Sequence, residues 1–313
     1  MRVTDLVRKY GWEALQNLNA LGVNPSYLSH VFFVDQNNPN ALDANDGYHG
    51  TNWETPYNTI AYAITRNNAT LDWSPDQGQW WGQNNYILVA PGKYEEELTS
   101  VPYACTVIGL GSCIDYPSTE GCVSIYSDSD SVIDVASIVA TTFKNIMFEC
   151  SASSEVNVQT DIMNNSAFIN CRFHTNVEDL TTHLQIGDMT RSTIRNCVFS
   201  SGTTHAATAI NVGAGSKTTM FGSLIEDCII NAATAGIVVD STVTLSGGGT
   251  WIRNNLISNP AKGIDLNNST NNLINVANNT IIASSDAIEG STAALTVGNM
   301  VNEAGTTAWE VDT

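Results

Sequence analysis

Cationic side chains are scarce in this chain. Its 313 residues include 12 Lys and Arg against 31 Asp and Glu, which gives a formal net charge of −19. A protein this acidic repels the phosphates of nucleic acids and the headgroups of anionic membranes. The chain also lacks an apolar run long enough to cross a bilayer. We therefore expect neither nucleic acid nor a membrane among its partners.

The first residues lack the apolar core of a secretory signal peptide. Met1 leads directly into the polar stretch RVTDLVRKYGWEALQ. We therefore expect a protein that is made in a cytoplasm and either stays there or is released by lysis. An extracellular mature form that has lost its signal is the alternative.

Cysteine motifs of metal and redox sites are missing as well. The chain has seven Cys, but it has no C-x-x-C pair and no Cys/His cluster with zinc-like spacing. The odd number argues against a full disulfide framework, and the spacing favours buried thiols. Reactive or metal-binding Cys are the alternative.

Charged residues make up only 14% of the chain, and Asn, Thr, Ser and Gly take their place. This mixture is typical of a β-protein with many turns and unlike that of a helix bundle.

A three-residue pattern recurs through the second half of the chain. An apolar residue stands at position i, a residue that we expect to point into the core stands at i+3, and another apolar residue stands at i+5. The middle members are Ile146, Cys171, Cys197, Cys228, Asn255 and Asn279, at intervals of 24 to 31 residues. A repeat of this length predicts a solenoid.

The spacing i, i+3, i+5 exceeds simple strand alternation by one residue. A residue in the left-handed region at a bend supplies the extra position, and Asn196, Asp227 and Asn254 occupy it. The next residue then points inward and stacks on its counterpart about 4.8 Å away in the following coil. We predict a structural ladder of Cys171, Cys197, Cys228, Asn255 and Asn279, with buried, unpaired thiols and hydrogen-bonded amides.

A second series runs in phase with the first. It consists of Ile133-Asp-Val, Leu184-Gln-Ile, Ile210-Asn-Val, Ile237-Val-Val, Ile264-Asp-Leu and Ile288-Glu. Two strand signals in each repeat, with a third strand in the looser stretch between them, predict a coil of three strands. We expect eight or nine coils and a rod on the order of 40 Å long.

Five motifs follow one another in the first third of the chain. They are a strand ending in Val34-Asp35, a D-x-N-D-G loop over 43–47, T-P-x-x-T-I-x-x-A-I over 55–64, V-A-P-G-x-Y-x-E over 89–96 and V-I-G-x-G over 107–111. Their order resembles the opening of right-handed parallel β-helix proteins of the pectate-lyase-like superfamily. The resemblance implies an all-β, right-handed parallel β-helix whose amino-terminal end is covered by a helix.

The sequence divides into three parts on this interpretation. Residues 1–30 form an arm with a predicted amphipathic helix over 4–21, which either covers the core or docks onto a partner. Residues 31–85 form a capping segment, in which Thr55 caps a helix that has Pro56 at its first position and an apolar stripe of Ile60, Ala63 and Ile64. Residues 86–313 form the β-helix.

The resemblance supports fold better than function, because that superfamily contains polysaccharide lyases, glycosidases and phage tailspikes and fibres. The R-x-P-x-x-R signature of pectate lyases is absent, and only His49-Gly50 matches a polygalacturonase motif. We therefore expect a non-enzymatic structural protein of a virus particle, such as a decoration, fibre or spike protein, that forms a homotrimer and contacts other virion proteins. The alternative is a polysaccharide lyase, a glycoside hydrolase or a glycan-binding module with a polysaccharide partner.

Four residues are the candidates for catalysis if the chain is an enzyme. Asp240, Lys262, Asp265 and Asp286 come from successive coils near the same strand, so that they could line one face. Paired carboxylates there would suit retaining or inverting hydrolysis. Ordinary solvated side chains on an outer face are the alternative.

Two further stretches carry candidate binding residues. In DQNNPNALDANDG, Asp35, Asp43, Asn45 and Asp46 are candidate Ca²⁺ ligands, although Asp and Asn also form turns; we expect no other cofactor. The stretch over 71–85 concentrates Trp73, Trp80 and Trp81. These rings pack on the chain's own cap, on a neighbouring subunit or on a sugar ring.

Overall fold

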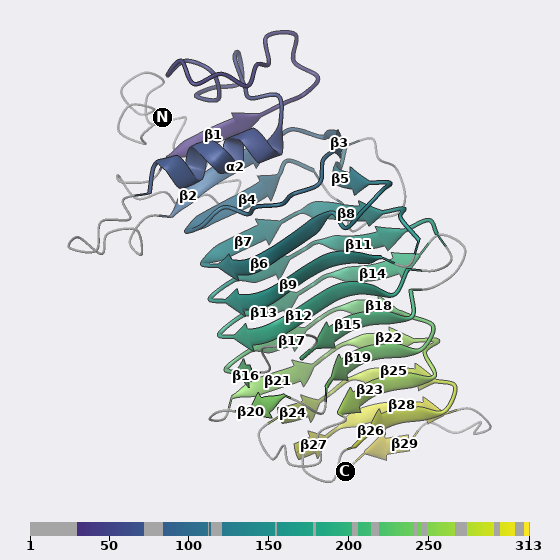
Figure 1. Cartoon of the computed structure of the whole chain (residues 1–313). Helices are drawn as coiled ribbons and strands as arrows, with labels where there is room; N and C mark the ends of the chain where they lie inside the picture. Colours follow the sequence, from purple (N-terminus) through teal and green to yellow (C-terminus); the bar gives the residue numbers. More distant parts are fainter. Residues whose placement is uncertain are drawn as a thin grey trace.

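The computed structural model describes residues 30–71, 84–111, 113, 121–153, 155–177, 180–201, 206–213, 219–240, 243–245, 249–266, 274–290, 295–303 and 310–312. Figure 1 shows strands stacked into a rod, with helix α2 and strand β1 at one end and strands β28 and β29 at the other. Successive coils contribute strands to three sheets, which we call sheets I, II and III. This is the parallel β-helix that the sequence predicts.

Sheet I contains ten strands in the described part of the chain. They are β1 (Val31–Val34), β2 (Asn85–Val89), β4 (Cys105–Gly109), β7 (Thr141–Lys144), β10 (Ala167–Ile169), β13 (Thr193–Arg195), β17 (Leu224–Glu226), β21 (Thr250–Arg253), β24 (Ile274–Ala277) and β27 (Leu295–Val297). The sheet has more rungs than the eight or nine coils expected, because β1 pairs with β2 as a rung of the stack.

Sheet II also contains ten strands among the described residues. They are β3 (Gly92–Glu95), β5 (Val123–Ser127), β8 (Ile146–Cys150), β11 (Arg172–Thr175), β14 (Val198–Ser201), β18 (Ile229–Asn231), β22 (Leu256–Ser258), β25 (Thr280–Ala283), β28 (Asn299–Glu303) and β29 (Glu310–Asp312). Neighbouring strands are parallel except β28 and β29, which pair antiparallel.

Sheet III contains the longest strands. Its members are β6 (Ile133–Val139), β9 (Val156–Asn164), β12 (Thr182–Thr190), β15 (Thr208–Val212), β16 (Thr219–Phe221), β19 (Ala235–Val239), β20 (Thr244–Leu245), β23 (Lys262–Leu266) and β26 (Asp286–Glu289). Strand β12 pairs with β9 along its whole length, whereas β15 covers one part of its other edge and β16 covers another part. The widest part of the sheet is therefore formed by β6, β9 and β12.

From β7 onward, each bend between sheets I and II has one residue in the left-handed conformation. At this bend Asn145, Asn170, Asn196, Asp227, Asn254 and Asn278 have φ between 52° and 57°. Asn and Asp tolerate this left-handed conformation better than most residues. The amides of adjacent bends also bond to one another, since Asn196 Nδ2 donates to Asn170 Oδ1 at 2.8 Å.

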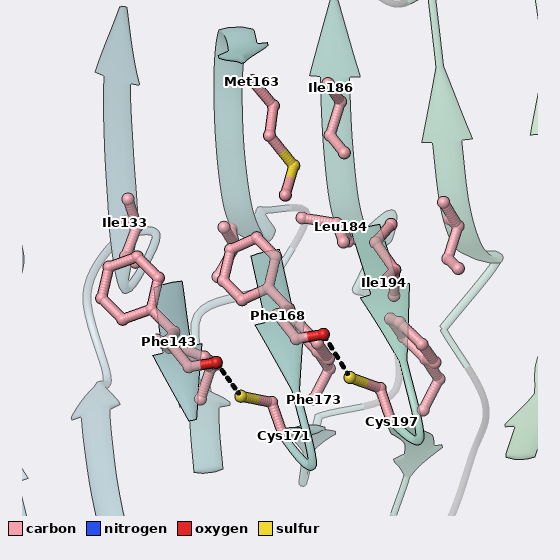
Figure 2. Packing of buried hydrophobic residues seen from close by; sticks show 14 of the residues in the cluster. Ile133, Phe143, Met163, Phe168, Cys171, Phe173, Leu184, Ile186, Ile194 and Cys197 are labelled. Carbon is pink, nitrogen blue, oxygen red and sulfur yellow. Dashed lines mark hydrogen bonds between the residues drawn. The ribbon is translucent and has the colours of Figure 1, made fainter. Parts of the chain in front are cut away.

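Aromatic rings of successive coils stack inside the rod. Phe143 and Phe168 lie 5.4 Å apart in one column, and Phe173 and Phe199 lie 4.7 Å apart in another. Figure 2 shows Phe143, Phe168 and Phe173 beside the thiols of Cys171 and Cys197. The periodic apolar residues thus fill equivalent inward positions, as a solenoid requires.

The middle members of the repeat occupy one buried column. Cys171, Cys197 and Cys228 are free thiols that stack at the corner between sheets I and II. Cys171 Sγ donates to Phe143 O at 3.4 Å, and Cys197 Sγ donates to Phe168 O at 3.5 Å (Figure 2). Burial, together with the neighbouring Cys171 and Cys228, raises the pKa of Cys197 well above its usual value.

The column changes to amides in later coils. Asn255 Nδ2 donates to Asn279 Oδ1 at 3.0 Å, and Asn279 Nδ2 donates to Asn299 Oδ1 at 2.9 Å. Asn255 Oδ1 in turn accepts from the Cys228 backbone N–H at 3.0 Å. Each buried amide therefore bonds to the next coil, and the ladder extends one residue beyond Asn279.

Two sequence-based expectations need correction. Helix α2 (Ile60–Ala69) is capped by Thr59, whose side chain accepts from the Tyr62 N–H, and it does not begin at Thr55 and Pro56. The reason is that Tyr57 is extended and bridges to Val34. The second correction concerns cysteine: Cys113 and Cys122 form a disulfide that packs against Met147 on the outside of sheet II.

Candidate functional site

A cleft of about 250 Å³ lies on the outer face of sheet III. It sits on the three longest strands, β6, β9 and β12. Its lining consists of Asp134, Val135, Ala136, Gln159, Thr160, Asp161 and Gln185.

Strand alternation explains why polar residues face this cleft. Ile133, Val158 and Leu184 point into the core and are fully buried. The following residues, Asp134, Gln159 and Gln185, are in register on adjacent strands and point outward. A column of one carboxylate and two amides therefore crosses the sheet at right angles to its strands.

The two carboxylates of the cleft are available to a ligand. Asp134 and Asp161 are both exposed, and neither makes a hydrogen bond or ion pair with the described residues. Asp161 lies on β9, the strand next to that of Asp134. It follows by two positions Gln159, which is the residue in register with Asp134. Strand spacing and rise place the two Cα atoms about 8 Å apart.

The outward column continues beyond the cleft. Asn211 of β15 is in register with Gln185, and its Oδ1 atom is buried without a hydrogen-bond partner in the described structure. Further along, Asp265 of β23 pairs with Glu289 of β26. Oδ1 of Asp265 is likewise buried without a partner there. Both oxygens are thus buried acceptors that the described residues leave unsatisfied.

Three of the four residues predicted for catalysis lie close together at the far end of this column. Lys262 Nζ donates to Asp265 Oδ2 at 3.0 Å and also contacts Glu289 Oε2. These hydrogen bonds raise the pKa of Lys262, and the bond that Lys262 donates to Glu289 has the largest effect. Asp286 is in register with Lys262 on the next strand, whereas Asp240 follows β19. The sequence interpretation missed Glu289, and a catalytic role for this group stays a prediction.

A denser polar network lies on the outer face of sheet II. Glu149 is only 5% exposed, and its carboxylate accepts from Asn176 Nδ2 at 2.9 Å and from Ser124 Oγ at 3.3 Å. Lys93 Nζ lies 3.7 Å from the same carboxylate and 3.6 Å from the centre of the Tyr126 ring. The Glu149 carboxylate is thus already hydrogen-bonded and ion-paired to residues of neighbouring coils.

The network continues to the next two coils. Arg172 is 6% exposed, and its Nη2 donates to Ser200 Oγ at 2.9 Å. His174 contacts Asn176 Oδ1 through Nε2 at 3.1 Å and Ser200 O through Nδ1 at 3.2 Å. Burial, with Arg172 as the second cause, lowers the pKa of His174.

The predicted Ca²⁺ ligands act as turn and cap residues. Asp43 accepts from the Asn58 and Thr59 backbone N–H groups, and Asp35 accepts from the Asn37 N–H. Asp46 accepts from the Tyr48 and His49 N–H groups, and these bonds, that from His49 first, lower its pKa. The described residues hold no group of three His, Cys, Asp or Glu placed to bind a metal. Calcium binding, which would also use the exposed Asn45, stays a prediction.

Other predictions fall on parts of the chain outside the described residues. These are Trp73, Trp80 and Trp81 and the helix over 4–21. Among the described helices, none is long and apolar enough to cross a bilayer.

The polarity of one set of outward positions in the sequence indicates the cleft, which hydrophobic periodicity alone does not locate. The middle residue of each triplet in the second series is an outward residue of sheet III: Asp134, Gln185, Asn211, Val238, Asp265 and Glu289. Five of these six are polar, which distinguishes this column from the inward ones beside it.

Comparison with known proteins supports the fold. No family model and no curated protein sequence matches the chain. A solved structure described as a pectin methylesterase mutant in complex with a hexasaccharide matches over 90% of this chain and 91% of its own, with a TM-score of 0.52 and 12% sequence identity. The chain therefore has the right-handed parallel β-helix fold of that structure.

Proposed function

We propose that the protein is a carbohydrate-active enzyme that binds a polysaccharide on the outer face of sheet III and hydrolyses it with Asp134 and Asp161. The observation that carries this proposal is the cleft in which two exposed carboxylates stand beside Gln159 and Gln185. Clefts with a few convergent polar groups are the usual place for small ligands and substrates.

The chemistry follows from the spacing of the two carboxylates. A general acid protonates the oxygen of the leaving sugar while a general base takes a proton from the attacking water, and the glycosidic bond breaks. Both side chains point outward from Cα atoms about 8 Å apart, so their carboxyl groups can reach the separation of about 6.5–9.5 Å that leaves room for this water in inverting enzymes. Gln159 and Gln185 would hydrogen-bond sugar hydroxyls and fix the ring between the two groups.

The fold comparison supports this proposal from a second direction, because the similar structure is described as an enzyme in complex with a hexasaccharide. Its low sequence identity transfers no residue and no reaction. The expectation of a virion structural protein that forms a homotrimer gains no support from the comparison and stays a prediction.

The test measures turnover and binding on a panel of soluble polysaccharides. Asp134→Asn and Asp161→Asn should each lower the rate of release of reducing ends by about 100-fold or more. The affinity for the polysaccharide should change far less in these variants, because the amides of Gln159 and Gln185 remain. Asp128→Asn is the matched control, since Asp128 is exposed in the turn after β5, outside the cleft lining.

Two results would decide against hydrolysis. Turnover that survives both Asn variants would place the chemistry elsewhere. Saturable binding without any turnover by the unmodified protein would make the cleft a glycan-binding site only.

A further inference from the structure

The strands that form the cleft carry charge of only one sign. Strands β6, β9 and β12 contain Asp134, Asp161 and Asp188 and no Lys or Arg. Asp130 and Glu155 lie just before β6 and β9 and add to the negative charge. A surface with charge of one sign sets the local potential and selects among charged ligands.

The described cations near sheet III lie outside the cleft lining. Arg191 follows β12, and its guanidinium lies 5.7 Å from the centre of the Phe221 ring. Lys262 is held by Asp265 and Glu289. Lys93 and Arg172 belong to the network on sheet II. No described cation lines the cleft.

The hydrogen-bonding groups of the cleft suit uncharged sugar substituents. Gln159 and Gln185 each carry a donor and an acceptor. Hydroxyl and acetamido groups match such partners. A uronate carboxylate or a sulfate would lose water in this cleft without gaining a cation.

From this arrangement we propose that the cleft takes a glycan without acidic groups, either uncharged or carrying amino groups, and that it rejects polyuronates and sulfated glycans. The inference rests on the proposed function, because it assigns a substrate class to the same cleft. We attribute the discrimination to charge, so oligomers of the same sugar with and without the charged group reveal it.

Two matched pairs of oligosaccharides provide the probes. One pair is oligogalacturonate and its methyl ester, and the other is the fully N-acetylated and the de-acetylated oligomer of glucosamine. Calorimetric titration of the unmodified protein should show the methyl ester binding about 10-fold or more tightly than the free acid. The amine should bind at least as well as its acetylated partner. Both differences should shrink as salt rises from about 20 to 500 mM, because salt screens exposed charges.

Charge variants test whether the cleft itself causes the preference. Gln185→Lys should improve binding of the free acid about fivefold or more, whereas Thr193→Lys on the outer face of sheet I is the matched control and should not. The double variant with Asp134→Asn and Asp161→Asn should show a smaller difference in affinity between the methyl ester and the free acid.

The outcomes distinguish a failure of the charge preference from a failure of the proposed function. Tighter binding of the free acid that still depends on Asp134 and Asp161 would overturn the charge preference and leave the glycan site standing. Binding of none of the four oligomers, or binding that ignores substitutions in the cleft, would overturn the proposed site and the charge preference together.

Discussion

The outer faces of sheets II and III carry the same kinds of side chain in opposite states. On sheet III, Asp134 and Asp161 are exposed and have no partner among the described residues. On sheet II, Glu149 and Arg172 are almost fully buried, and each is hydrogen-bonded to a neighbouring element. The same stack of coils thus presents free charges on β6 and β9 of sheet III and hydrogen-bonded charges on β8 and β11 of sheet II.

The difference arises from what the adjacent coil offers. Stacked strands bring residues in register to within about 4.8 Å of each other. Glu149 is in register with Tyr126 and His174, and it is reached by Lys93 and Asn176. Asp134 instead meets the neutral amide of Gln159. We infer that the sheet II network stabilises the rod, whereas the sheet III column remains available to a ligand.

The largest effect on stability is expected from Glu149→Ala. Hydrogen bonds to a buried charge contribute roughly 1.5–3 kcal/mol, so this variant should lose about 2–3 kcal/mol of the free energy of unfolding. The matched change Asp134→Ala should stay within about 0.5 kcal/mol of the unmodified protein. Urea denaturation followed by circular dichroism measures both. Equal losses of the free energy of unfolding in Glu149→Ala and Asp134→Ala would contradict the difference between the two faces.

A smaller loss is expected from Arg172→Met. Methionine retains much of the apolar stem of Arg172 but removes the bond to Ser200. The expected loss is about 1 kcal/mol. Arg195→Met on sheet I is the control, because Arg195 is 48% exposed and lies 3.8 Å from Glu226. Glu226 keeps its closer ion pair with Arg253 at 2.8 Å in this variant. Loss of the exposed Arg195 should therefore lower the free energy of unfolding by less than about 0.5 kcal/mol.

The sheet II network should also make stability depend on pH. Burial and Arg172 lower the pKa of His174 in the folded protein. As the pH falls below about 6.5, the unfolded chain binds a proton at this residue before the folded chain does. The free energy of unfolding therefore decreases with falling pH in this window and is fully present above it.

Denaturation at about pH 7.5, 6.5 and 5.5 measures this effect. His174→Asn should flatten the decrease below about pH 6.5, whereas Asp128→Asn should leave the decrease in that window as it is. An unchanged slope in His174→Asn would assign the pH dependence to other groups.

The fold could be predicted because its inward positions repeat. Every coil must fill the same column, so Phe143, Phe168 and Ile194 recur at the same place in the pattern. The bend residues could be predicted for the same reason, since Asn196 and its counterparts need the left-handed region.

Local hydrogen bonding was harder to predict. Thr55-Pro56 has the composition of a helix start, but the Glu96 carboxylate accepts from the Ile60 and Ala61 N–H groups and favours a start four residues later. Glu96 lies 36 residues from Ile60 in the chain. Likewise, a separation of nine residues says nothing about whether Cys113 and Cys122 meet.

The candidate site was the least predictable part. Outward polar residues follow the same alternation whether they bind a ligand or only water. The choice of Asp240, Lys262, Asp265 and Asp286 rested on their occurrence in successive coils. In the structure Lys262 and Asp265, both on β23, pair with each other. The state of Asp134 and Asp161 depends on what the adjacent strands carry, and a hydrophobic repeat does not contain that information.

Thiol labelling of the native protein gives the smallest expected effect and reports where a substitution acts. Cys150 lies next to Glu149 on β8 and is fully buried, whereas Cys228 lies three coils further along sheet II and is equally unpaired. Each coil contacts only its neighbours, so loosening at β8 should fade along the rod. Glu149→Ala should therefore speed labelling of Cys150 more than that of Cys228, and Asp134→Ala should speed neither. Equal acceleration of both thiols in Glu149→Ala would show that the network stabilises the whole stack as one unit and not only the coils it joins.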